Sequence, residues 1–395
     1  MTFHGTSPQP STQAANTTRL VIGLRANSRT SGGGLVFFRE LATALVGHPD
    51  VDVVIFATGG RSAIIWPEGA TIVSVPTPKS RHLARLRATH DLQRCVDEHP
   101  VDVLICPGTE VTPVKGPTIA VWPLTVAPFE ADALKQLGDS LRQRLRWAIL
   151  RQLVKRACRR ADFSFFSSAY ARDLHQRSIQ HLRTVPAFVA HPAASLPNAT
   201  DDSWVEGETE HLLFVSHLYP YKMVVEMVES YGDAARVNEA VPPLIIAGGM
   251  RDAAYATRVE RARVASGVAH KIQLVGEKNQ SELHDLYKKA QAFIFPSISE
   301  NAGSYALIDA FAYGVPVISS NASSMPEICG DSALMVDPRD RQALTESILR
   351  VATNQDAAKE LAALSLARTS WFPTWPHIAE LVVAGCTAAQ PRDAR

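Results

Sequence analysis

The segment FIFPSISENAGSYALIDAFAYGVPVISS, which runs from Phe293 to Ser320, decides the fold. It begins as an apolar strand and continues through a turn of small residues that holds one carboxylate, Glu300. A helix follows that carries a second carboxylate, Asp309, and we expect this helix to end at Gly314 with a left-handed cap. The segment therefore predicts a strand, a turn and a helix, with an acidic group on either side of the turn.

Short β-branched runs alternate with longer amphipathic stretches along most of the chain. They are RLVIGL, VDVVIFAT, TIVSVP, VDVLICP, TIAVW, DFSFFSS, HLLFVS, PLIIAGG, KIQLVG, AFIFPS and VPVISS. Buried runs with helical segments between them are typical of parallel sheets that helices cover on both faces. The polar interval from Asn198 to Glu210 is the predicted linker. The sequence thus predicts an α/β protein of two doubly wound parallel-sheet domains, with a cleft where their strand ends face each other.

Length and composition limit the class of protein. A chain of 395 residues suits two domains, and a net charge of +1 creates no general attraction for nucleic acid. The five cysteines are scattered without C-x-x-C spacing, which argues against a disulfide framework or a zinc site and favours the reducing cytoplasm. We find no apolar run long enough to span a bilayer, and we interpret residues 1–18 as a disordered tail.

A glycine-rich loop follows the first strand, and Gly32, Gly33 and Gly34 precede a helix. Glycines at a helix N-terminus allow backbone N–H groups to approach a phosphate. A nicotinamide-dinucleotide site would instead need G-x-G-x-x-G directly after the strand and an acid at the end of the second strand. Because the second strand ends in Thr58 and Gly59, we discount that site. A loop that only turns the chain remains the alternative.

Two basic residues follow the first strand of the second domain, which ends at Ser216. His217 and Lys222 stand five positions apart around a Tyr-Pro-Tyr turn, from which both could reach the cleft. Two cations there could offset the charge of a leaving diphosphate. A lysine in a loop is usually only solvated, and the phosphate role becomes preferable when the acidic segment is considered with it.

The turn after Glu300 predicts a second anion site. The backbone amides of Ala302, Gly303 and Ser304 lie at a helix N-terminus, where they can point toward the cleft. Carboxylates beside a diphosphate would be repelled unless they bind hydroxyl groups. We therefore expect one acid to bind a sugar and the other to bind a ribose diol.

These elements together resemble glycosyltransferase family 4, of the group 1 type. Members are retaining, nucleotide-sugar-dependent transferases of the GT-B fold. The resemblance covers nearly the whole chain and includes KRACRRADFSFFSSAYARDL, but the two-acid element followed by GVPVISSNASSMPEICGDSALMVDP is its most specific part. It implies an acceptor-binding domain at 19–197, a nucleotide-sugar-binding domain at 198–370, and a C-terminal helix at 371–395 that crosses back to the first domain.

The resemblance also assigns roles to individual residues. It places Glu300 at the donor sugar, Asp309 at the nucleotide ribose and Lys222 at the donor phosphates. It matches Gly33 and Gly34 with the glycines that cover the diphosphate from the first domain.

Three positions depart from the family pattern. Asp309 is an aspartate where glutamate is usual, and it follows Glu300 by nine positions where eight is the usual offset. His217 stands where arginine is commoner, so its charge depends on pH. Thr125 stands near a position that is often histidine, on the expected acceptor side.

The function implied by the resemblance is transfer of a hexose or deoxyhexose from a nucleotide diphosphate sugar to a glycan or lipid-linked acceptor, with retention. Cell-surface polysaccharide or lipopolysaccharide biosynthesis is the expected setting. No D-x-D element follows a strand, so we expect no metal or other cofactor, with protein cations stabilising the leaving group. The alternatives are another GT-B reaction, such as that of a sugar-nucleotide epimerase or a phosphorylase, and a nucleotide-sugar-binding protein without turnover.

The segment LRQRLRWAILRQLVKRACRR, from Leu141 to Arg160, predicts a basic amphipathic helix. Eight basic residues and no acids accompany an apolar face, which comprises Leu141, Leu145, Ala148, Ile149, Leu153 and Ala157. Such a helix can lie on an anionic membrane. We assign Arg142, Arg146 and Arg156 to this contact and hypothesise a peripheral association with the inner leaflet. A helix that faces the other domain with a solvated basic side is the alternative.

Overall fold

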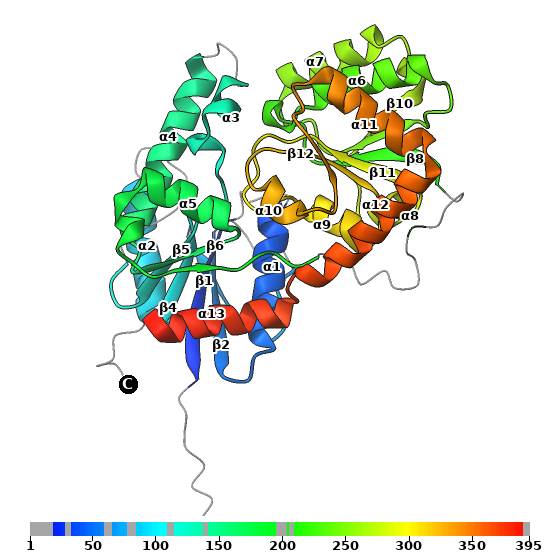
Figure 1. Ribbon diagram of the computed structural model, residues 1–395. Coiled ribbons are helices and arrows are strands. Elements are labelled where there is room, and N and C mark those ends of the chain that lie inside the picture. The colour runs from blue at the N-terminus through cyan, green and yellow to red at the C-terminus, as the bar shows by residue number, and fades with distance from the viewer. Residues whose placement is uncertain are drawn as a thin grey trace, which may run out of the picture.

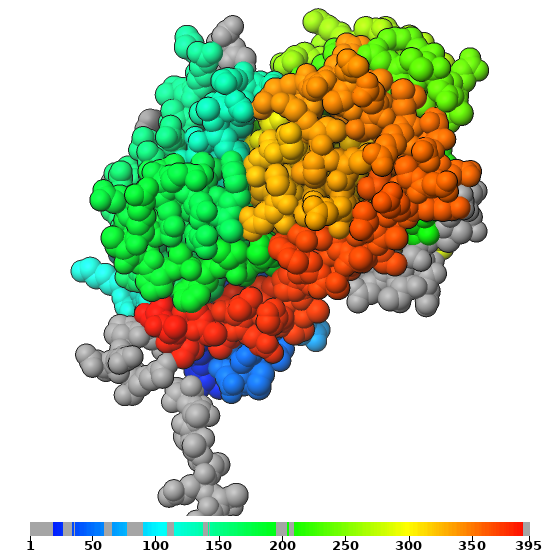
Figure 2. Space-filling model, viewed as in Figure 1, coloured from blue at the N-terminus to red at the C-terminus, as the bar shows by residue number. Residues whose placement is uncertain are grey.

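The computed structural model describes residues 19–27, 33–58, 65–76, 84–108, 114–136, 141–194, 204 and 209–389. The expected tail at 1–18, most of the expected linker at 198–210, and Gly32 lie outside the described residues. The described chain forms two α/β domains (Figure 1), which touch along a seam in the space-filling view (Figure 2).

The first domain contains a parallel sheet with the strand order β3-β2-β1-β4-β5-β6-β7. Its strands are β1 (Leu20–Asn27), β2 (Val51–Thr58), β3 (Thr71–Val75), β4 (Val103–Pro107), β5 (Thr118–Trp122), β6 (Phe163–Phe166) and β7 (Ala187–Val189). The order reverses between β1 and β4, which is the switch point of a doubly wound sheet.

The second domain repeats this arrangement with the order β10-β9-β8-β11-β12-β13, again with parallel pairings. Its strands are β8 (His211–Val215), β9 (Leu244–Ala247), β10 (Ile272–Gly276), β11 (Ala290–Phe295), β12 (Val317–Ser320) and β13 (Leu334–Val336). Its switch point lies between β8 and β11. The prediction of two doubly wound parallel-sheet domains is confirmed.

Helices cover the sheets and connect their strands. The α-helices are α1 (Gly33–Val46), α2 (Ala84–Glu98), α3 (Ala131–Lys135), α4 (Leu141–Cys158), α5 (Ala169–Ser178), α6 (Val224–Val237), α7 (Ala253–Ala265), α8 (Gln280–Lys288), α9 (Tyr305–Ala312), α10 (Met325–Cys329), α11 (Arg341–Thr353), α12 (Gln355–Arg368) and α13 (Trp375–Ala389). Short 3₁₀ turns are η1 (Ala127–Phe129), η2 (Gln180–Arg183), η3 (Pro220–Lys222), η4 (Ala269–Lys271) and η5 (Thr369–Trp371). None of these helices combines the length and the apolar character needed to cross a membrane.

The two strands that the sequence pattern missed, β7 and β13, are sheet edges of three residues each. A run this short cannot show the alternation or the continuous burial that marks a strand in a sequence. Central strands are different, because β4 is buried along its whole length and reads as an unbroken apolar run.

The last helix, α13, belongs by packing to the first domain. Ile378, Ala379, Val382 and Cys386 are buried in the same cluster as Trp122 of β5. In Figure 2 this red segment leaves the second domain and runs along the base of the first. The chain therefore crosses between the domains twice.

The basic helix α4 is exposed in its N-terminal half and partly buried in its C-terminal half. Of the six residues expected on one apolar face, Ala157 is buried, whereas Leu141, Leu145, Ala148 and Ile149 are exposed. The N-terminal half of α4 rises above the sheet (Figure 1), and only its C-terminal half meets the core. The apolar residues of the N-terminal half therefore face away from the core.

Candidate functional site

A cavity of about 310 Å³ lies between the two domains. Residues after β8 and after β11 form one side, and residues of the first domain form the other. The lining residues are Gly34, Phe37, Leu124, Thr125, Val126, Ala127, Ser167, Pro192, Ser216, His217, Tyr219, Tyr221, Lys222, Ser299, Glu300, Asn301, Ala302, Gly303, Ser304 and Tyr305.

The fold explains why the second-domain side of the cavity is polar. Strands β8 and β11 are neighbours at the switch point, so the segments that follow them diverge and leave a crevice. Ser216 follows β8 and Glu300 follows β11, which places their loops at the same edge of the sheet. The amide of Ile298 donates to the carbonyl of Tyr221 at 2.9 Å and ties the two loops together.

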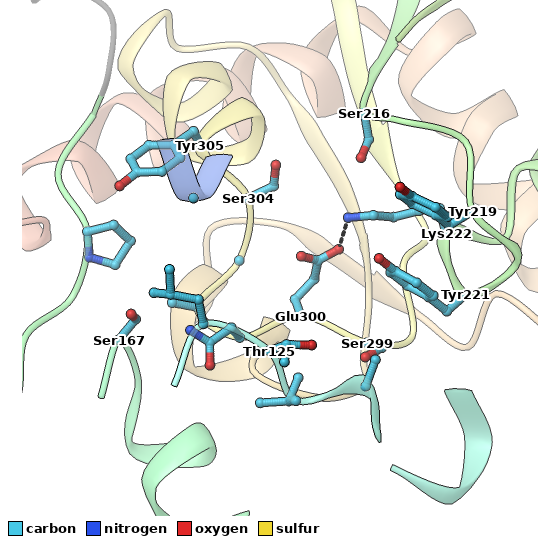
Figure 3. Close-up of a pocket in the computed structure, with 18 of the residues that line it drawn as sticks. Thr125, Ser167, Ser216, Tyr219, Tyr221, Lys222, Ser299, Glu300, Ser304 and Tyr305 are labelled. Carbon is cyan, nitrogen blue, oxygen red and sulfur yellow. Dashed lines mark hydrogen bonds and ion pairs between the residues drawn. The ribbon is translucent and has the colours of Figure 1, made fainter. Parts of the chain in front are cut away.

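Lys222 and Glu300 meet at this edge. The Lys222 ammonium donates to Oε1 of Glu300, and both side chains are buried. Nζ of Lys222 also lies 5.0 Å from the ring centre of Phe295, the last residue of β11. Figure 3 shows the ammonium reaching Glu300 across the cavity wall. The pair combines a cation with two further donor protons and a carboxylate with further acceptor positions, directed at the same space.

The turn between Glu300 and α9 is held by local geometry. Gly303 has φ +68°, and a Cβ at this position would come within 2.9 Å of the Ile328 side chain, so glycine is required. Ser304 caps α9 by accepting from the amide of Ala306 at 3.3 Å. The Gly303 amide itself donates to Ser324 Oγ at 3.0 Å. Of the amides predicted to form an anion site, that of Gly303 is therefore already engaged.

Helix α9 ends as the sequence predicted. Gly314 adopts φ +66°, its amide bonds the Phe311 carbonyl at 2.9 Å, and the Val315 amide bonds the Ala310 carbonyl at 2.9 Å. These two bonds form a Schellman motif. The left-handed cap at Gly314 is confirmed.

Asp309 lies in α9 and is only 4% exposed. Its neighbours Glu300 and Ser304 line the cavity, whereas Asp309 does not. Its charge raises the pKa of Tyr287 and Tyr305, after the larger effect of burial on each. The carboxylate therefore stands behind the cavity wall, and its predicted ribose contact stays a prediction.

His217 lines the cavity as a neutral hydrogen-bond donor. Its Nδ1 accepts from the amide of Gly249 at 3.2 Å, which leaves the ring proton on Nε2. Burial lowers the pKa of His217, and the charges of Arg251 and Lys222 lower it further, although Glu277 opposes them. The bond from Gly249 and the lowered pKa favour the neutral imidazole at this position, where the sequence predicted a charge that depends on pH.

The first domain contributes small and apolar groups to the cavity. Gly34 lines it from the first turn of α1, and Gly33 is the residue at which that helix begins. Thr125 lines it from the loop after β5, and Ser167 from the end of β6, where it accepts a hydrogen bond from Trp122 Nε1 at 2.9 Å. Thr125 is thus brought to the site.

The predicted basic residues lie on α4. Arg146 and Arg156 are exposed on this helix, and the side chain of Arg142 lies outside the described residues. Helix α4 meets the second domain through Gln143, which donates to Asp252 at 3.0 Å, and through Trp147, whose ring lies edge-on to Tyr221 at 6.2 Å.

Several cavity and seam residues were missed by the sequence interpretation. Tyr219 and Tyr221 stack at 5.6 Å with an interplanar angle of 6°, beside Lys222 (Figure 3). Their Tyr-Pro-Tyr spacing was the available signal.

Two carboxylates at the domain seam, Glu130 and Glu327, were also missed. Glu327 accepts from the amides of Ala169 and Tyr170 at 2.7 and 2.8 Å, at the N-terminus of α5, and from His191 at 2.7 Å. Nothing in the local sequence indicates such a contact, because the partners are more than 130 positions away.

The second domain is similar in sequence to a known protein family. Residues 200–365 match the family model described as "Glycosyl transferases group 1". O-antigen chain mannosyltransferase B of Escherichia coli is 30% identical over 170 residues, which cover 42% of this chain and 43% of that protein. The chain thus spans less than half the length of this curated relative.

Solved structures superpose on nearly the whole length of this chain. A sucrose-phosphate synthase from Thermosynechococcus elongatus superposes with a TM-score of 0.75 at 17% identity, covering 95% of this chain and all of that one. Anabaena Alr3699/HepE in complex with UDP-glucose gives a TM-score of 0.73 at 13% identity, covering 94% and 100% of the two chains. At these identities the likeness establishes the fold, and the predicted GT-B fold is confirmed. Residues 200–365 are therefore similar to the group 1 glycosyl transferases, within a chain of GT-B fold.

Proposed function

We propose that this protein transfers a hexose or deoxyhexose from a nucleotide diphosphate sugar to a hydroxyl of a glycan or lipid-linked acceptor, with retention of the anomeric configuration. The observation that carries the proposal is the buried Lys222–Glu300 pair in the cavity between the domains. The family match of the second domain supports the same class of reaction. The E. coli relative is an O-antigen chain mannosyltransferase, which supports a role in cell-surface polysaccharide or lipopolysaccharide biosynthesis.

The roles of the residues follow from their chemistry. Lys222 can offer its remaining protons to the diphosphate while it bonds Glu300, whose other acceptor positions can take the sugar hydroxyls. Nε2 of His217 adds a neutral donor, and the N-terminus of α9 adds a partial positive charge. Negative charge that develops on the leaving diphosphate is thereby met by fixed protein groups, and we propose that no metal is required. Gly34, together with Gly33, would cover the diphosphate from the first domain.

The test is a panel of nucleotide sugars, scored for release of the free nucleotide, with and without a lipid extract and with EDTA. Release that depends on one donor and on the extract, and that persists in EDTA, supports the proposal. Epimerisation or phosphorolysis without any acceptor would favour another GT-B reaction. Tight donor binding with no turnover under any condition would favour a binding protein.

We also propose that helix α4 binds peripherally to the anionic inner face of the cell membrane. Leu141, Leu145 and Ile149 follow one another at four-residue intervals and are 80%, 62% and 47% exposed. Exposed Arg144, Arg146 and Arg156 share the helix, which carries no acid. An exposed apolar stripe flanked by arginines suits the interface of an anionic bilayer. A lipid-linked acceptor at that surface would lie near the mouth of the cavity.

A further inference from the structure

Glu130 is a buried carboxyl group of the first domain that lies against the second. It follows η1, and only 7% of the residue is exposed. Three hydroxyl groups surround its carboxyl oxygens. Tyr170 of its own domain donates at 2.6 Å, Ser323 of the second domain lies at 2.7 Å, and Ser299 of the second domain donates to Oε2.

Ser323 connects Glu130 to the main chain of Glu300. Its Oγ accepts from the Glu300 amide at 3.0 Å and lies 2.8 Å from the Glu300 carbonyl oxygen. A hydroxyl carries one proton, so Ser323 donates either to that carbonyl or to Glu130, and an ionised carboxylate is the stronger acceptor. Glu130 therefore influences which bond Ser323 makes to the Glu300 turn.

The backbone of Ser323 is itself constrained. Its φ is +58°, in the left-handed region that a serine rarely adopts. A residue held in this region costs free energy, and it persists because surrounding contacts fix it. The hydrogen bonds to Glu300 and Glu130 are the contacts available here. Ser299, the residue directly before Glu300, is held by the same carboxyl group.

The surroundings of Glu130 make its interactions sensitive to the other domain. Burial raises the pKa of Glu130, the three hydroxyl groups lower it, and the charge of Glu300 raises it again. Its titratable neighbours include Tyr170, Tyr221 and Glu300. Two of its three hydrogen-bond partners belong to the second domain, so separating the domains would leave the buried group with one.

We propose that Glu130 is a positioning residue, whose carboxyl fixes the Glu300 turn through Ser299 and Ser323 when the first domain closes on the second. This role deepens the proposed function, because it makes the geometry of the Lys222–Glu300 pair depend on domain closure.

The direct test is amide hydrogen exchange in the peptide that spans residues 297–304. Glu130→Ala should accelerate exchange there by about tenfold or more, because the Ser323 hydroxyl group that accepts from the Glu300 amide is no longer held by Glu130. Ser323→Gly should do the same, since glycine adopts the left-handed backbone easily and removes the side chain that carries the hydroxyl group. This second variant keeps the test valid even if Glu130→Ala folds poorly.

Asp132 provides the matched control. It lies two positions after Glu130 and bridges the same seam to Arg339 at 2.9 Å, but its side chain is half exposed and bonds Lys135 and Arg339 instead of the Glu300 turn. Asp132→Asn should therefore leave exchange at residues 297–304 within about twofold of the wild type.

Turnover gives a second readout. Glu130→Ala should lower kcat by about tenfold to a hundredfold with little change in the donor KM, because a misplaced turn affects the transition state more than binding. Glu130→Gln should recover part of this loss, since its amide can still accept from one hydroxyl group and donate to another. Asp132→Asn should change neither constant.

The outcomes separate the proposals. The positioning role is overturned if the exchange rate at residues 297–304 is the same in Glu130→Ala and Asp132→Asn. It is also overturned if exchange in Glu130→Ala accelerates evenly over the whole protein. A wild-type protein that turns over no donor defeats the proposed function, while the exchange comparison still decides the role of Glu130.

Discussion

Lys222 and Glu300 form a buried ion pair although 78 positions separate them in the sequence. They meet because β8 and β11 are adjacent at the switch point of the second sheet, so the loops that follow these strands share one edge. Removing either residue would leave the other as an unpaired buried charge, which would destabilise the folded protein.

The first prediction concerns this pair. Lys222→Met should reduce turnover by about a hundredfold or more, through loss of a transition-state charge donor. It should also lower the free energy of unfolding by about 3–5 kcal/mol, because Glu300 is left as an unpaired buried charge. The double variant Lys222→Met, Glu300→Gln should recover most of that stability and none of the turnover. Urea unfolding and nucleotide release measure the two effects, and normal activity in folded Lys222→Met would remove Lys222 from the mechanism.

The second prediction separates the two acids of the turn and helix. Glu300→Gln should lower turnover while the affinity for the free nucleotide diphosphate stays nearly unchanged, because Glu300 is assigned to the sugar. Asp309→Asn should weaken that affinity by about tenfold, through loss of a charged acceptor for the ribose diol. Calorimetric titration of both variants with the nucleotide diphosphate is the measurement. Equal losses of affinity would show that the assignment of separate roles is wrong.

The third prediction concerns the pH dependence of the seam at Glu327. Burial alone would raise the pKa of this carboxyl, but hydrogen bonds from His191 and from the amides of Tyr170 and Ala169 outweigh burial and lower it. A lowered pKa means that the contact stabilises the folded state above the ordinary value of 4.5 and is lost as pH falls through the folded value. Glu327→Gln should therefore cost about 1–2 kcal/mol near neutral pH.

Urea unfolding of Glu327→Gln and of the wild type at pH 7.5 and at pH 4 provides the check. The difference between the two proteins should be smaller at pH 4, because the unfolded carboxyl group takes up a proton below 4.5 and the stabilisation by the ionised folded group begins to be lost. A difference that stays constant across this range would contradict the role of the ionised group.

The fourth prediction concerns helix α4. Charge reversal at Arg142, Arg146 and Arg156 should abolish sedimentation with anionic vesicles at low salt, since each basic residue near such a surface contributes about 1 kcal/mol. Replacing Leu141, Leu145 and Ile149 by glutamine should weaken sedimentation at every salt concentration. The control replaces Leu364 and Leu366, which are also exposed but lie on α12. If the wild-type protein does not sediment with these vesicles, the membrane contact is rejected.

Local patterns were sufficient for much of the fold. Burial on both faces makes the central strands unbroken apolar runs, and the stop at Gly314 follows from the conformation that only glycine adopts easily. Lys222 and Glu300 were found because each lies in the segment that follows a strand, and strand ends converge in parallel sheets.

What the sequence could not provide depends on distant partners. Glu130 has no local motif, because its hydroxyl partners lie 40, 169 and 193 positions away. The neutral state of His217 depends on the amide of Gly249, which belongs to the loop after the neighbouring strand. The apolar face of α4 was identified correctly as a stripe, but its exposure depends on where the helix leaves the domain. Such facts require the tertiary structure.

The return of α13 to the first domain has a consequence for recombining this protein with relatives of the same fold. Gly385 of α13 packs so closely on Phe165 that a Cβ would lie 3.0 Å from its ring, and Val382 is fully buried beside it. A chimera that joins this first domain to the second domain of a relative at a single crossover would carry a foreign α13 into that fitted surface. The segment to exchange is instead the internal one between the first interdomain crossing and η5. The first domain and α13 then come from the same protein.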